Sequence, residues 1–72
     1  MLKVFKLLNG EEIIANAEVT GLGYTLSHPA AIVIQQTEKG VGVALAPYMP
    51  YAESDITLYA SSIATEGSPA KS

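Results

Sequence analysis

The chain has 72 residues, of which 49% are hydrophobic and 15% charged, and its formal net charge is −3. One domain fits this length, and so small a domain buries only about 60% of the surface that its unfolded chain exposes. With no cysteine and a single histidine, His28, disulfides, thiolate metal sites and a multi-histidine zinc site within one chain are excluded. We expect no cofactor and no metal, and stability from self-association.

The few basic residues limit the possible partners. Four lysines and no arginine argue against a surface that follows a phosphate backbone, although a ring would repeat each lysine once per subunit. Lys3 and Lys6 interrupt the first apolar residues, so no secretory signal is expected. The longest apolar run, residues 30–34, is far shorter than the ~20 residues that cross a bilayer. We expect a soluble cytoplasmic protein with no membrane partner.

The first half of the chain predicts a hairpin. Residues 2–8 alternate in part and predict a strand, and Asn9-Gly10 predicts a tight turn. Residues 11–20 alternate with period two and predict the second strand. A helix is the alternative there because Glu and Ala favour helices, but the turn before and Gly21-Leu22-Gly23 after favour a strand.

The second half predicts three further strands. Residues 24–37 form a third strand or a pair of strands broken at Pro29, and strands are also predicted over 41–48 and 56–65, with a loop over 51–55. No segment predicts a helix. The fold class expected is therefore all-β, a small five-stranded, strongly bent open barrel over residues 1–66, followed by a flexible tail over 67–72.

The sequence offers no convincing catalytic group. Glu11 and Glu12 are neighbours in an extended segment, so their carboxylates point to opposite faces and do not converge on one substrate. Ser27 and His28 diverge for the same reason, and no carboxylate nearby in the sequence orients the imidazole. We expect no enzymatic activity.

The tyrosines and the uncharged strands say more about binding and self-association than the candidate catalytic residues do about chemistry. Tyr24, Tyr48 and Tyr51 either stack on bases or pack at a subunit interface, and the pattern leaves both readings open. Residues 41–46 and 56–60 carry no charge, so these strands are poorly protected against pairing with another chain. Pairing of the last strand with a neighbour's fourth strand is a head-to-tail contact, which closes into a ring when the angle suits.

Residues 4–19, VFKLLNGEEIIANAEV, resemble the first motif of the Sm-like (LSm) family: a strand, an Asn-Gly turn, and a long bent strand with a small residue, Ala15, in its middle. The hairpin, the segment from Tyr24 to Pro29 and the segment from Pro47 to Tyr51 are together most similar to small Sm-like proteins of marine cyanophages. The family differs in having an N-terminal helix, an Arg-Gly or Lys-Gly pair in its second motif, and an Asp where this chain has Thr20-Gly21.

The resemblance implies an SH3-like barrel in a homo-oligomeric ring of about five to seven subunits, joined through strands four and five. It also implies single-stranded RNA binding at the loop after strand two and the loop between strands four and five. For a phage-encoded chain the location is the host cytoplasm. The candidate nucleic-acid-binding residues in this sequence are Tyr24, Thr25, Ser27, His28, Lys3 and Lys39.

The leading prediction is thus a non-enzymatic nucleic-acid-binding ring with a role in RNA or DNA processing. The alternative is a structural or protein-interaction ring of phage origin that binds no nucleic acid. Lysines gathered with Tyr24 and His28 on one face would favour the first, and scattered lysines would favour the second.

Overall fold

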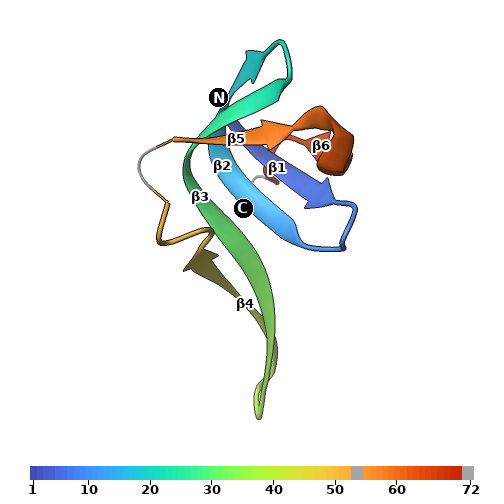
Figure 1. Cartoon of the computed structure of the whole chain (residues 1–72). Coiled ribbons are helices and arrows are strands. Elements are labelled where there is room, and N and C mark those ends of the chain that lie inside the picture. The colour runs from blue at the N-terminus through green and yellow to red at the C-terminus, as the bar shows by residue number, and fades with distance from the viewer. Residues whose placement is uncertain (53–54, 71–72) are drawn as a thin grey trace.

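The computed structural model describes residues 1–52 and 55–70. Within these ranges the chain forms β-strands and one short 3-10 helix but no α-helix, so the all-β prediction is confirmed (Figure 1). No helix among the described residues is long and apolar enough to cross a membrane. The elements are β1 (Leu2–Leu7), β2 (Glu12–Thr20), β3 (Gly23–Thr37), β4 (Gly40–Pro47), β5 (Ile56–Tyr59), η1 (Ala60–Ser62) and β6 (Ile63–Gly67).

The strands form one antiparallel, strongly bent sheet that does not close into a complete barrel. The order is β4-β3-β2-β1-β6, and β5 also pairs with β3. The first part of β3, Gly23 to Leu26, pairs with β5, and its second part, Ala30 to Thr37, pairs with β4. Strands β4 and β5 therefore make one interrupted edge of the sheet, and β6 makes the other.

The last predicted strand, residues 56–65, is wrong in one respect, because η1 divides it into β5 and β6. Ile56–Tyr59 pairs with β3, whereas Ile63–Gly67 pairs with β1 on the opposite side of the sheet. A straight strand cannot reach both partners, so the chain turns sharply at residues 60–62. The hydroxyl of Ser62 donates to the carbonyl oxygen of Tyr59 at 2.8 Å and holds this corner. The sheet consequently has six strands instead of the predicted five.

The third predicted segment is one continuous strand, and Pro29 does not break it. The register with β2 shifts between Ile14 and Asn16, which is the signature of a β-bulge. The extra residue belongs to β3, where His28 and Pro29 face the single residue Ala15 of β2, and His28 has a φ of 51°. The irregularity bends the sheet at that point, so the second part of β3 leaves the barrel.

The core is small and lies on the concave side of the bent sheet. Alternate residues of β1 and β2 are buried, as the period-two pattern predicts. The buried side chains are Phe5, Leu7, Ile13, Ala15, Ala17, Leu26 and Leu58. Phe5, Ile13 and Leu26 are fully enclosed, and no buried side-chain polar atom in the described residues lacks a hydrogen bond.

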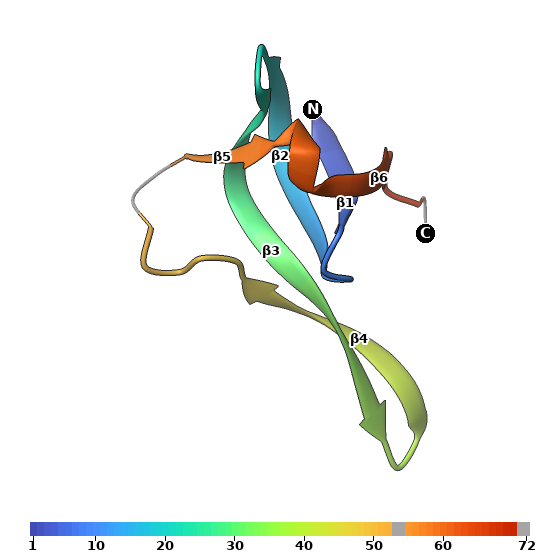
Figure 2. The same ribbon diagram turned by 45° about the vertical axis from the view of Figure 1, so that its right-hand side comes forward.

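Beyond the barrel the chain extends a long hairpin. It consists of residues 30–47, the second part of β3 with β4, and we call it the arm. Figures 1 and 2 both show the arm leaving the barrel and ending at the β3–β4 turn. The molecule is accordingly elongated, with principal extents of 44 × 25 × 24 Å.

Candidate nucleic-acid interface

The six predicted binding residues lie in three separate places. Lys3 on β1 and Tyr24 on β3 are brought together, with the Lys3 ammonium 5.4 Å from the centre of the Tyr24 ring. Ser27 and His28 lie farther along β3, and Thr25 points away from Tyr24 because neighbours in a strand alternate. Lys39 lies in the turn at the tip of the arm. The structure therefore assembles a pair from this set and not a single cluster.

The Lys3–Tyr24 pair is held between the core and an acidic partner. The Tyr24 ring packs on Phe5 with a centroid distance of 5.0 Å and a tilt of 58°. Lys3 also forms an ion pair with Glu66 of β6 at 3.5 Å. Hydrogen bonding to the Glu66 carboxylate, followed by burial, raises the pKa of the Tyr24 phenol. Part of the Tyr24 ring surface is therefore used inside the protein.

A crevice lies beside this pair, where the β2–β3 turn meets η1. The Ala60 amide donates to the carbonyl oxygen of Leu22 at 2.9 Å and joins the two connections. The crevice has a volume of about 440 Å³ and is lined by polar and apolar atoms in similar amounts, with Tyr24 and Glu66 in its wall. We call it the turn crevice, and its lining includes Val19, Thr20, Leu22, Tyr24, Ala60 and Glu66.

Gly23 allows the two connections to approach each other. Its φ is +151°, and a Cβ atom there would overlap the carbonyl oxygen of Leu58 and come within 2.7 Å of the Ala60 nitrogen. The turn before it is closed by the Thr20 hydroxyl, which accepts a hydrogen bond from the Leu22 amide at 3.3 Å. The Thr-Gly-Leu-Gly sequence thus sets the shape of the turn crevice.

Sequence reasoning missed the η1 side of the crevice. The sequence pattern predicts one continuous last strand that includes Ala60, far from the turn after β2. The Ser61-Ser62 pair was the available signal, because adjacent serines in an otherwise apolar strand favour a local turn with side-chain to backbone hydrogen bonds. A prediction that broke the strand there would have brought η1 to the β2–β3 turn.

A second pocket lies beside His28. It has a volume of about 460 Å³ and is lined by His28, Pro29, Pro47, Tyr48, Met49, Pro50, Ala52, Asp55 and Ile56. Ser27 donates to Asp55 at 2.9 Å at its rim. Burial, followed by the nearby Glu11 carboxylate, raises the pKa of Tyr48. Tyr48 packs against the core, whereas Tyr51 is 99% exposed, so the YMPY segment carries one packing and one free tyrosine.

The charges around these sites are mostly balanced locally. Lys6 pairs with Glu12 at 3.7 Å, in addition to the Lys3–Glu66 pair. Lys39 is exposed and forms no ion pair within residues 1–52 and 55–70. Those same ranges hold no group of three or more His, Cys, Asp or Glu side chains placed to bind a metal ion.

No protein-family model and no curated protein sequence matches this chain.

Proposed function

We propose that the chain is a non-enzymatic subunit of an Sm-like homo-oligomeric ring that binds single-stranded nucleic acid, primarily RNA. The observation that carries this proposal is the contact between the β2–β3 turn and η1. β4 and β5 pair with successive parts of β3, so together they take the place of the fourth strand of the resembled family, and β6 takes the place of its fifth strand. The connection between those two strands is then η1. These two connections are the ones that line the nucleotide site in the family that the sequence resembles.

The ring would form through the two edges of the sheet. β4 carries no charged residue, and its outer edge is unpaired in the described chain, as is that of β6. An uncharged edge such as that of β4 pairs readily with another strand. Pairing β4 of one subunit with β6 of the next uses two different surfaces, so it can close into a ring, for which the resemblance suggests about five to seven subunits.

Binding would rest on stacking more than on charge. A base entering the turn crevice would meet the exposed part of Tyr24 and the Leu22 side chain, and the free backbone groups of the turn would hydrogen-bond to it. Stacking of this type contributes about 1–3 kcal/mol per base. Lys3 would contact a phosphate, and repetition around the ring would raise the avidity of a strand that spans several subunits.

Fluorescence anisotropy with labelled oligo-U and oligo-A at low and physiological salt tests the proposal. Lys3→Gln should weaken binding and lower the salt dependence, whereas Glu66→Gln should strengthen binding because it frees Lys3 and removes a carboxylate from the crevice. Glu12→Gln is the matched control, since it frees Lys6 outside the crevice and should leave the affinity near that of the unaltered protein.

The second candidate function is a structural or protein-interaction ring that binds no nucleic acid. Two observations favour it. Lys39 and His28 lie away from the Lys3–Tyr24 pair, so the lysines do not gather on one face. Lys3 and Lys6 are both already paired with glutamates, and the chain as a whole is acidic. Absence of RNA binding at low salt by an intact ring would select this candidate over the first.

A further inference from the structure

The arm carries a large aliphatic face that the isolated chain does not cover. Residues paired across antiparallel strands point to the same side, and the pairs Ile32–Leu45, Ile34–Val43 and Gln36–Val41 share one side of the arm. Ile34, Val41, Val43 and Leu45 are 73%, 70%, 69% and 61% exposed. We call Ile32, Ile34, Val41, Val43 and Leu45 the aliphatic face. The opposite side carries mostly small or polar residues, such as Ala44, Gly42 and Gln35.

The aliphatic face is distinct from the strand edge that the proposed ring uses. Edge pairing joins backbone groups of β4 to another strand and leaves the side chains on both sides of the sheet where they were. Isolated apolar residues on a surface are ordinary, but a contiguous apolar patch marks an interaction site. The arm therefore presents a second interface.

We propose that this face packs against the same face of a second copy of the chain, with the two arms antiparallel. No charge lies among its five residues or at the neighbouring Gln36, so two copies meet without like-charge repulsion. A contact between identical faces closes by a two-fold axis. Two uncharged sheet faces stack about 10 Å apart, as the layers of a β-sandwich do.

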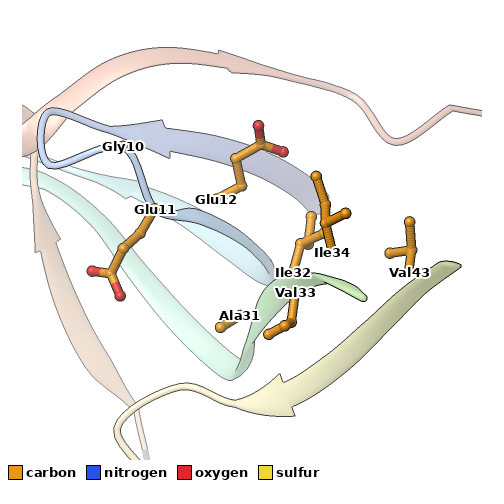
Figure 3. A pocket seen from close by; sticks show the side chains of 8 residues that line it. All are labelled: Gly10, Glu11, Glu12, Ala31, Ile32, Val33, Ile34 and Val43. Carbon is orange, nitrogen blue, oxygen red and sulfur yellow. The ribbon is translucent and has the colours of Figure 1, made fainter. Parts of the chain in front are cut away.

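The charges at the two ends of the arm support the antiparallel arrangement. Lys39 lies at the tip, exposed and without an ion pair in the described residues. Glu11 and Glu12 lie at the base, where with Ile32, Ile34 and Val43 they line a hollow of about 410 Å³. Figure 3 shows Glu12 on the same side as Ile32 and Ile34, whereas Glu11 points to the other side with Ala31 and Val33. Glu12 is therefore the carboxylate beside the aliphatic face. Antiparallel arms bring Lys39 of one copy to Glu12 of the other.

The small size of the aliphatic face limits the strength of the contact between two arms. A standard interface uses about 20–30 residues from each partner, and this face supplies far fewer, so one pair of arms forms only a weak contact. When subunits are already gathered in a ring, the contact repeats and avidity makes it stable. The face would then join two rings and double the number of subunits. The contact between two chains does not itself depend on RNA binding.

Native mass spectrometry and sedimentation velocity test this inference by counting subunits. The unaltered protein should contain an even number of subunits, and Ile34→Lys should halve it. Gln35→Lys places the same charge on the opposite, already polar side of the arm and should leave the number unchanged. Circular dichroism on both variants establishes that the strands are retained.

A charge reversal provides a second, milder variant. Lys39→Glu should weaken the association about three- to tenfold, because each two-fold contact loses two exposed ion pairs. An odd number of subunits in the unaltered protein, or the same number in Ile34→Lys, overturns the inference. A ring that binds RNA with an odd subunit number would overturn this inference alone and leave the proposed function standing.

Discussion

Gly23 and Leu58 lie so close that a side chain at position 23 would overlap the Leu58 carbonyl oxygen. The two residues are in neighbouring strands, β3 and β5, next to the Gly23–Tyr59 pair. This approach brings η1 within hydrogen-bonding distance of the β2–β3 turn, where Ala60 donates to Leu22. The shape of the turn crevice therefore depends on the absence of one Cβ atom.

Gly23→Ala should lower the free energy of unfolding by about 2–4 kcal/mol, because the obstruction is backbone and the φ is one that side chains rarely adopt. Urea denaturation at fixed protein concentration measures the loss. Gly42→Ala is the control, since an added Cβ there meets no atom within 4 Å, and its effect should stay below about 0.5 kcal/mol. Equal stability of the two variants would contradict the close packing of β3 on β5.

The small core predicts a high sensitivity to lost methyl groups. Ile13 is fully enclosed, so Ile13→Val should cost about 0.5–1.5 kcal/mol and Ile13→Ala about 2–5 kcal/mol. Val19 of the same strand is 79% exposed, and Val19→Ala should have little effect. Thermal unfolding followed by circular dichroism separates these cases. A comparable loss at both positions would mean that the core extends along β2 as far as Val19.

The Tyr24–Glu66 contact predicts a loss of stability at alkaline pH. The folded-state pKa of Tyr24 is raised above its ordinary value of 10.0, chiefly by hydrogen bonding to Glu66. The stability that the protonated Tyr24 phenol contributes is therefore fully present below pH 10.0 and is lost as the pH rises through the folded-state pKa. The reason is that Tyr24 releases its proton at lower pH in the unfolded chain than in the folded one. Tyr24→Phe should flatten this alkaline decline in urea unfolding curves. A decline of the same steepness in Tyr24→Phe would show that another group is responsible.

Particular residues show how far the sequence could predict the structure. The alternation from Glu12 to Thr20 is read directly from apolar and polar positions, and β2 follows it. Asn9-Gly10 marks the first turn for a local reason as well, because the Asn9 side chain accepts a hydrogen bond from the Glu11 amide at 2.9 Å. Local signals of this kind are present in the sequence itself.

The division of the last strand depends on partners that are distant in the chain. Whether Ile56–Tyr59 and Ile63–Gly67 lie on one strand or two is decided by their pairing with β3 and β1. The grouping of the candidate site residues could not be predicted for the same reason, since Lys3 meets Tyr24 and Glu66 only after β1, β3 and β6 have assembled. Sequence spacing gives no direct measure of such contacts.

The most direct test of the central claim is native mass spectrometry of the protein with and without an oligo-U strand, which counts subunits and bound RNA in one spectrum. With a chain mass of 7.5 kDa, the account predicts a complex of about five to seven subunits, or twice that number if the arms pair, that gains the mass of the oligonucleotide. A monomer or simple dimer that gains no oligonucleotide would contradict it.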